Sequence, residues 1–235
     1  CEASQRYIKK IILQMKANIF NLLLITSLVV FSCKGKQGEI QQEETAKQQD
    51  TVAMQTTPTF NPADLPEEPV FDIVTNVGTI RVKLYKETPL HRDNFVKLAS
   101  ERFYDGILFH RVIRGFMIQV GDPLTKDPAA SDRYGTGGPG YTVPAEILPQ
   151  FKHKKGAIAA ARRADSVNPQ RESSGSQFYF VEDPGACAQL DGQYTVFGET
   201  VSGIDIIDKI AAEPTTPRDR PVNDIRIISV KPVKE

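Results

Sequence analysis

The side chains best suited to chemistry are a cation and two amides set among strand-forming residues. Arg111 and Gln119 lie on either side of a turn that contains Gly115, and Gln177 precedes a later apolar run. Arginine stays protonated and offers several hydrogen-bond donors in a rigid fork. Together with the flexible apolar side chain of Met117, these groups could hold an apolar ligand by shape and bind its backbone through a few donors.

The length of that turn decides which of these side chains share a face. A two-residue loop would put Arg111 and Gln119 on opposite faces of the hairpin. A three-residue loop would pair Arg111 with Gln119, and Ile113 would then lie opposite Met117. We predict the second register, because it brings the cation, the amide and the methionine together on one face.

The same residues also have purely structural interpretations. Arg111 could form an ion pair on a strand surface, and Gln119 and Gln177 could anchor loops through their amides. Phe116, Met117 and Leu190 are of types that more often pack in a core. His110 is adjacent to Arg111, so on a regular strand it should face the other way, and we interpret it as structural.

Composition narrows the possible functions of the chain. Its 235 residues are enough for one large core or two small ones. Lys and Arg number 29, and so do Asp and Glu, so the charge balance does not favour a nucleic-acid partner. Cys1, Cys33 and Cys187 are too widely spaced for a metal site or a disulfide framework. We expect no metal, no cofactor and an unpaired thiol at Cys187.

Residues 1–33 have the pattern of an upstream extension followed by a targeting segment. Met15 is a plausible start, which would make residues 1–14 an upstream extension. The apolar run from Ile19 to Phe31 is short for a membrane span but suits a signal peptide. Residues 30–33, Val-Phe-Ser-Cys, resemble a bacterial lipobox, which implies cleavage before Cys33 and lipid attachment to it. The alternative, a core helix, fits poorly with the polar low-complexity sequence that follows.

Residues 34–69 are rich in Gln, Glu, Lys, Thr and Pro. Such a segment buries too little apolar surface to offset the entropy cost of ordering. We predict a flexible polar linker, with a helix over residues 39–50 as the alternative. Residues 70–235 then form the folded domain.

From residue 70 the pattern predicts many short strands and two helices. Apolar and polar residues alternate over residues 79–85. Thr88 and the proline after it begin one helix, and Ser202 with Asp205 begins another as a capping box. The last strand, over residues 223–232, changes phase at residues 227–228, which indicates a bulge. An antiparallel sheet of many short strands must hide its edges, and closing is one way to do so.

Several stretches match one known family. Residues 109–122 contain Phe-His-Arg-Val-Ile, Gly-Phe-Met-Ile-Gln and Gly-Asp, which resemble the signature of the cyclophilin-type peptidyl-prolyl cis-trans isomerases. The runs at 174–180 and 190–198 match as well, and the glycine-rich run at 135–146 resembles the loop beside the family's substrate groove. That run lacks the lysine and strand of a phosphate-binding loop. The resemblance implies a mainly β fold, a closed eight-stranded antiparallel β-barrel capped by two α-helices.

The resemblance also implies an activity, rotation about X-Pro bonds. Rotation breaks amide resonance, a barrier of about 18–20 kcal/mol, and needs an enzyme that binds the twisted amide better than the planar one. Twisting makes the prolyl nitrogen basic, and Arg111 would be the catalytic donor to it. The residues implied to bind the substrate are Phe116, Met117, Gln119, Ala161, Arg162, Gln177, Tyr179, Leu190 and Tyr194.

These residues divide by implied role. Phe116, Met117 and Leu190 would form the proline pocket. Gln119 and Gln177 would hold the peptide backbone, and Ala161 and Arg162 would offer backbone groups. Tyr179 stands where the family usually has phenylalanine, so its hydroxyl needs a partner. Tyr194 replaces a histidine of many relatives, and Gln189 replaces an aromatic residue that contacts cyclosporin.

We therefore predict a lipid-anchored isomerase of the bacterial cell envelope. It would act as a monomer on proline-containing unfolded or extended polypeptides, and only the lipid would contact the membrane. One alternative is a chaperone or scaffold module that binds proline segments with incidental turnover. Another is a closed barrel that carries a small apolar ligand, although small eight-stranded barrels can be filled by their own side chains.

Overall fold

The computed structural model describes residues 58–233, which belong to one compact unit, Ala53–Glu235. The predicted signal segment, Cys33 and most of the predicted linker lie outside the described residues. No helix within residues 58–233 is both long enough and apolar enough to cross a membrane.

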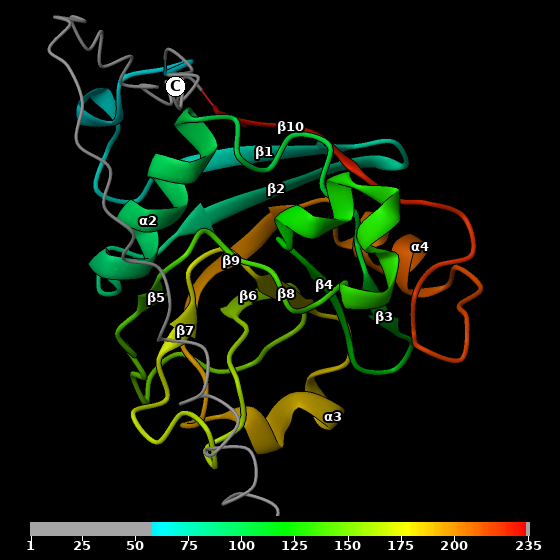
Figure 1. The fold of residues 1–235 in the computed structure, drawn as a ribbon. Helices are drawn as coiled ribbons and strands as arrows, with labels where there is room; N and C mark the ends of the chain where they lie inside the picture. Colours follow the sequence, from blue (N-terminus) through cyan, green and yellow to red (C-terminus); the bar gives the residue numbers. More distant parts are fainter. Residues whose placement is uncertain (1–57, 234–235) are drawn as a thin grey trace, which may run out of the picture. The chain divides into compact units, whose positions relative to one another are not determined.

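Eight strands form one antiparallel sheet (Figure 1). In chain order they are β1 (Val70–Thr75), β2 (Gly78–Leu84), β3 (Arg111–Ile113), β4 (Met117–Val120), β6 (Ala157–Ala160), β8 (Phe178–Val181), β9 (Val196–Ser202) and β10 (Ile227–Pro232). Across the sheet their order is β10-β1-β2-β9-β6-β8-β4-β3. A separate pair consists of β5 (Thr142–Val143) and β7 (Ser173–Ser174).

Two longer helices, α2 (Pro89–Ser100) and α4 (Ile204–Ala211), lie toward opposite ends of the sheet (Figure 1). The shorter elements are η1 (Pro62–Asp64), η2 (Pro123–Lys126), η3 (Pro128–Arg133), α3 (Pro184–Cys187) and η4 (Ala188–Leu190). The predicted start of α2 is confirmed, with Thr88 as N-cap residue. The predicted capping box of α4 is wrong, because β9 runs through Ser202 and Gly203, with a φ of 87°, is the N-cap residue.

The sheet is an open half-barrel, and the prediction of a closed barrel is wrong. β3 and β10 stand at the two ends of the strand order and do not pair with each other. The residues before β3 meet the start of β10 through the isolated bridge between Leu108 and Arg226 and through the hydrogen bonds of Ile227 with Gly106 and Ile107. The N–H of Phe109 also donates to the carbonyl oxygen of Ile225 at 2.9 Å. Because β3 has three residues, it is too short to continue these contacts into a ladder.

The core of the half-barrel is filled by aromatic and branched side chains. Its largest fully buried members include Phe71, Phe95, Tyr104, Phe109, Phe178 and Phe180. The ring centroid of Phe95 lies 5.2 Å from that of Tyr104 and 5.6 Å from that of Phe178. A core packed in this way leaves no room for the apolar ligand of the carrier hypothesis, which the structure therefore contradicts.

The end of the segment predicted as linker packs against the domain. The N–H of Thr59 donates to the carbonyl oxygen of Ser100 at 3.0 Å, and the rings of Phe60 and Phe71 lie 5.8 Å apart. The N–H of Leu84 donates to the carbonyl oxygen of Pro69. The polar composition of residues 58–69 concealed these contacts, in which Phe60 and Leu65 pack against the core and backbone groups add hydrogen bonds.

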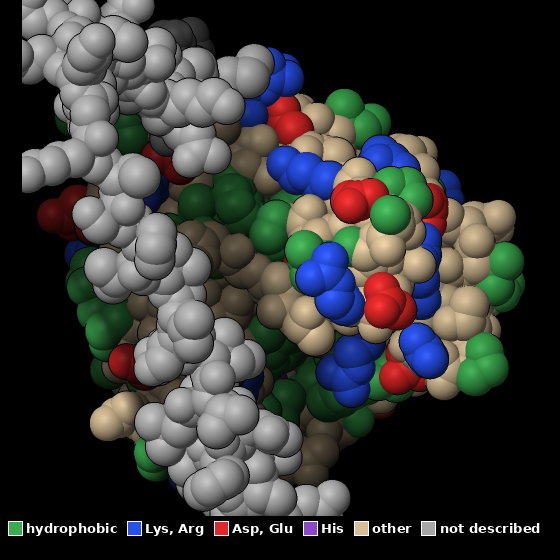
Figure 2. Space-filling view, viewed as in Figure 1, with side chains coloured by type: hydrophobic (Ala, Val, Ile, Leu, Met, Phe, Trp, Pro, Cys, Tyr) green, Lys and Arg blue, Asp and Glu red, His purple; other side chains and the backbone are tan. Residues whose placement is uncertain are grey.

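The predicted bulge in the last strand is confirmed. Val74 pairs with Ser229 and Thr75 with Ile227, so Ile228 is the extra residue and its side chain is exposed. On the face shown in Figure 2, Lys and Arg side chains lie beside Asp and Glu side chains, as expected for a chain with no net charge.

Candidate active site

The hairpin of β3 and β4 has the predicted register. Arg111 pairs with Gln119 and Ile113 with Met117 across a three-residue turn. In that turn Gly115 has a φ of 75°, which favours glycine, and its N–H donates to the carboxylate of Glu182 at 2.7 Å. The turn therefore sets the faces of the hairpin as the sequence predicted.

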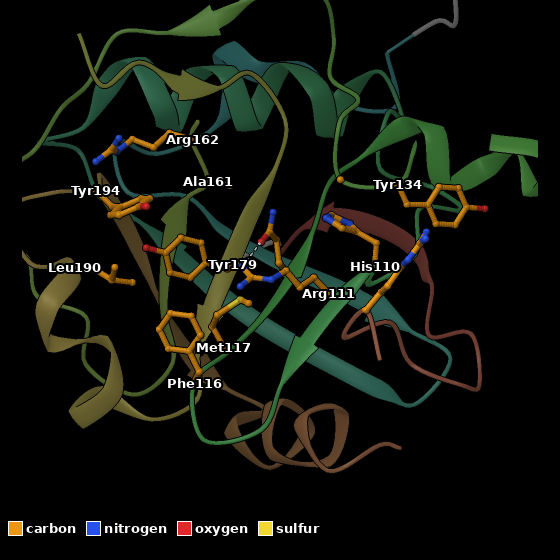
Figure 3. A pocket seen from close by; sticks show the side chains of 13 residues that line it. His110, Arg111, Phe116, Met117, Tyr134, Ala161, Arg162, Tyr179, Leu190 and Tyr194 are labelled. Atoms are coloured by element: carbon orange, nitrogen blue, oxygen red, sulfur yellow. Dashed lines mark hydrogen bonds between the residues drawn. The ribbon is translucent and has the colours of Figure 1, made fainter. Parts of the chain in front are cut away.

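A cavity of about 300 Å³ opens beside this hairpin (Figure 3). Its lining residues are His110, Arg111, Phe116, Met117, Gln119, Tyr134, Gly135, Ala161, Arg162, Tyr179, Leu190, Tyr194 and Arg218. Every residue predicted to contact the substrate is among them, except Gln177. The hairpin, the end of β6, β8, η4 and the turn before β9 thus bring together predicted site residues that are up to 83 positions apart in the sequence, as Arg111 and Tyr194 are.

One end of the cavity is apolar. Phe116, Met117, Tyr179 and Leu190 face one another there in Figure 3. Met117 is 2% exposed and Tyr179 is 4% exposed, so both are held firmly by the packing around them. Such an end suits a small apolar ring and holds it by shape.

Arg111 supplies the cation at this end. Its Nη1 donates to Oε1 of Gln119 at 3.4 Å, and its Nε lies 3.9 Å from Oδ2 of Asp219. The predicted structural alternative, a surface ion pair, is thus present, but both partners are nearly half exposed and such pairs contribute little. Both contacts are long, which leaves donors of the guanidinium available to a ligand.

The two glutamines differ in what they do. Nε2 of Gln119 donates to Oε1 of Gln177 at 2.9 Å. Nε2 of Gln177 donates in turn to the carbonyl oxygens of Gly135, at 3.1 Å, and Gly137, at 2.7 Å. Gln177 therefore anchors a loop, the structural alternative for this residue. It lines a second, neighbouring cavity of about 760 Å³ rather than the one beside Arg111.

The glycine-rich loop is held by a buried carboxylate. Asp122 is fully buried, and its Oδ2 accepts hydrogen bonds from the N–H groups of Gly135 and Gly137. A Cβ at Gly137 would lie 2.1 Å from Oδ1 of Asp122, so the close approach requires glycine. These contacts account for Gly135 and Gly137 without a phosphate ligand.

Ala161 and Arg162 were predicted to offer backbone groups to a peptide, but only some of these groups lack a partner within the domain. The N–H of Ala161 donates to Gln177 and its carbonyl oxygen accepts from Ser174, so both groups are used within the domain. The backbone N–H and carbonyl of Arg162 have no such partner among the described residues. The guanidinium of Arg162 lies 4.4 Å from the ring centroid of Tyr194 and bonds to the carbonyl of Gln193. Of the two, Arg162 alone can offer its backbone to a peptide.

Sequence reasoning missed three side chains of the cavity: His110, Tyr134 and Arg218. His110 lines the cavity although its ring nitrogens are buried, while the neighbouring side chain of Arg111 is 45% exposed, a difference that agrees with the predicted alternation. Burial lowers the pKa of His110 to about 4. Tyr134 and Arg218 come from distant irregular segments, and no local pattern indicated them.

Two other residues singled out in the sequence lie outside the cavity lining. Cys187 is buried with its Sγ 3.4 Å from the carbonyl oxygen of Phe116, and burial raises the pKa of its thiol to about 12. Nε2 of Gln189 donates to the carbonyl oxygen of Ala186. Within residues 58–233 no group of His, Cys, Asp and Glu side chains is arranged to hold a metal ion.

An open eight-stranded half-barrel with this arginine-bearing apolar pocket has the cyclophilin fold. The model of the family described as "cyclophilin type peptidyl-prolyl cis-trans isomerase/CLD" matches residues 70–232. The chain therefore belongs to the cyclophilin-type peptidyl-prolyl cis-trans isomerases, as the resemblance implied.

Known relatives agree with this assignment. Peptidyl-prolyl cis-trans isomerase B of Streptomyces anulatus is 39% identical over 175 residues, which cover 66% of this chain and 91% of that protein. Peptidyl-prolyl cis-trans isomerase-like 2 of Rhizopus delemar is 36% identical over 166 residues, 68% of this chain but only 28% of that longer protein. A crystal structure of a Cryptosporidium parvum cyclophilin type isomerase in the presence of the dipeptide Ala-Pro has a TM-score of 0.62 at 26% identity, and the match covers 71% of this chain and 99% of that one.

Proposed function

We propose that the isomerase reaction takes place in the cavity beside Arg111. The proline ring would enter the apolar end formed by Phe116, Met117 and Leu190. The Arg111 guanidinium would donate to the prolyl nitrogen as the amide twists and that nitrogen becomes basic. Because the planar amide nitrogen is a poor acceptor, this bond stabilises the transition state more than the ground state, which is the requirement for catalysis.

One observation carries this assignment. The guanidinium of Arg111 lines the same cavity as the apolar side chains, and the hairpin register places it opposite Gln119. Gln119 is held in turn by Gln177, so the amide opposite Arg111 is fixed from the glycine-rich loop. The backbone of Arg162 would pair with the peptide on the other side of the cavity.

The test is an isomerisation assay on the full chain with a short X-Pro peptide. We expect exchange well above the uncatalysed rate, and a rate equal to that of buffer would overturn the proposal. The same peptide should shift the methyl resonance of Met117 in an NMR titration. Met54, which remains after the proposed cleavage before Cys33, serves as an internal control. A shift confined to Met54 would show that the peptide binds elsewhere.

We further propose that the protein acts as a lipid-anchored monomer in the bacterial cell envelope on proline-containing unfolded or extended chains. The support is the apolar run before Ser32 and Cys33, followed by a polar segment. Mass spectrometry of the mature N-terminus should find a lipid-modified Cys33, and Cys33→Ser should release the protein from membranes. Persistence of peptides upstream of Cys33 would contradict the anchor. Light scattering of the detergent-solubilised protein tests the monomer.

A further inference from the structure

The hydroxyl of Tyr179 is bound behind the pocket by a buried histidine. The oxygen of Tyr179 lies 2.8 Å from Nε2 of His153, and the two rings are nearly parallel, at 10°. The side chain of His153 is 0% exposed. The ring of Tyr179 thus lines the pocket, while its polar end points into the protein.

The second nitrogen of the same histidine reaches the opposite wall. Nδ1 of His153 lies 2.8 Å from Oδ1 of Asp191, and that oxygen also accepts the backbone N–H of His153 at 2.9 Å. Asp191 follows Leu190 directly and is the residue after η4. Two short contacts therefore join Leu190 to Tyr179 through one imidazole that lies outside the pocket lining.

The partners determine how the protons are arranged. Asp191 accepts, so Nδ1 of His153 carries the hydrogen, and Nε2 then accepts the hydroxyl hydrogen of Tyr179. Burial lowers the pKa of His153 in spite of the adjacent Asp191, and burial also raises the pKa of Tyr179. Both rings are neutral at neutral pH. The Tyr179 hydroxyl donates to His153 and points away from the pocket, so it serves neither as a nucleophile nor as an acid for the ligand.

We propose that His153 is a positioning residue of the isomerase, which sets the width of the proline pocket by linking Tyr179 to the Asp191–Leu190 wall. Arg111 stands on a different strand, and its hydrogen bond and ion pair go to Gln119 and Asp219, outside this network, so the chemical step should not depend on His153. Loss of the link should weaken substrate binding and leave turnover nearly unchanged. This inference rests on the proposed function of the pocket.

A double-mutant cycle separates positioning from general structural support. His153→Asn keeps a donor near the Nδ1 position for Asp191 but withdraws the partner of Tyr179. His153→Gln keeps a polar group near the Nε2 position. We expect His153→Asn to raise KM for an X-Pro peptide roughly threefold to tenfold, the size of one net hydrogen bond, with kcat changed less than about twofold. His153→Gln should recover most of the affinity.

The background variant is Tyr179→Phe. If His153 acts through the hydroxyl, His153→Asn should have less than half its effect on log KM when Tyr179 is already phenylalanine. An equal rise of KM in both backgrounds, or a fall in kcat at constant KM, would overturn the proposal. Circular dichroism establishes that each variant is folded. If His153→Asn does not fold, Tyr179→Phe alone decides, because it breaks the same link, and an unchanged KM would refute the role.

The wild-type protein and Arg111→Ala, measured in parallel, keep this test distinct from that of the proposed function. If the wild type does not exceed the uncatalysed rate, the proposed function fails. The Kd of the same peptide then replaces KM in the double-mutant cycle. The role of His153 stands if His153→Asn raises this Kd less in the Tyr179→Phe background than in the wild type, and it fails if the rise is equal.

Discussion

Replacing Arg111 by alanine is expected to remove most of the catalysis and little of the peptide affinity. A hydrogen bond from a charged donor contributes about 1.5–3 kcal/mol, which corresponds to roughly tenfold to hundredfold in rate. The side chain of Arg111 is 45% exposed, so solvent screens its charge and we expect the lower half of that range. The apolar end of the pocket is untouched by the substitution, so ground-state binding should persist.

The structure also indicates that this variant will fold. The contacts that Arg111→Ala removes are a 3.4 Å hydrogen bond and a 3.9 Å exposed ion pair with Asp219, which together contribute about 1 kcal/mol or less. Gln119 keeps its bond to Gln177. A loss of activity can therefore be assigned to the missing guanidinium, provided that the thermal midpoint stays close to that of the wild type.

The assay compares kcat/KM for an X-Pro peptide with the Kd of the same peptide. Arg81→Ala is the matched control, because Arg81 is 44% exposed, lies on β2 and pairs with Asp72 away from the cavity. We expect the control to change kcat/KM less than about twofold, since an exposed ion pair contributes little. The reasoning is refuted if Arg111→Ala keeps more than half of kcat/KM, or if its Kd rises as much as its kcat/KM falls.

Three further predictions concern stability. Gly121→Ala should lower the free energy of unfolding in urea by more than about 3 kcal/mol. Gly121 has a φ of 104°, and an added Cβ would lie 2.1 Å from the carbonyl oxygen of Ser176. A loss below about 1 kcal/mol would contradict this prediction. Burial raises the pKa of Glu146, but hydrogen bonds from the His91 ring and from two N–H groups at the start of α2 outweigh it and hold that pKa below its ordinary value of 4.5. The wild type should therefore lose this stabilisation as the pH falls below that value, and Glu146→Gln should flatten the fall in unfolding experiments at several pH values. Burial lowers the pKa of His110 from 6.5 to about 4, so the unfolded chain is protonated first on acidification. The wild type should lose up to about 3 kcal/mol between those two pH values, and an equal loss in His110→Gln would contradict this origin.

Local periodicity was sufficient for the central hairpin. Strand side chains alternate with a period of two, so a choice between two turn lengths determined whether Arg111 faces Gln119. The phase change that predicted the bulge near Ile228 is a signal of the same kind. Both depend on residues within a few positions of one another, where the geometry of the chain itself limits the possibilities.

Features that depend on distant segments were not predictable in this way. Gln177 anchors Gly135 and Gly137, which lie 42 and 40 positions away, and nothing near Gln177 in the sequence indicates this role. The openness of the half-barrel depends on whether the segments before β3 and β10 meet in register. His110 lines the cavity beside Gly135, which lies 25 positions further along the chain.

The sequence by itself determined the residue types of the pocket, the faces of the hairpin and, through the motif around Arg111, the family. Only the tertiary structure decided that the sheet stays open, that Gln177 serves the loop and that His153 binds the hydroxyl of Tyr179. The physical reason is that side-chain alternation is a property of a single strand. The partner of a buried polar group, in contrast, depends on which remote segment the packed core brings within hydrogen-bonding distance.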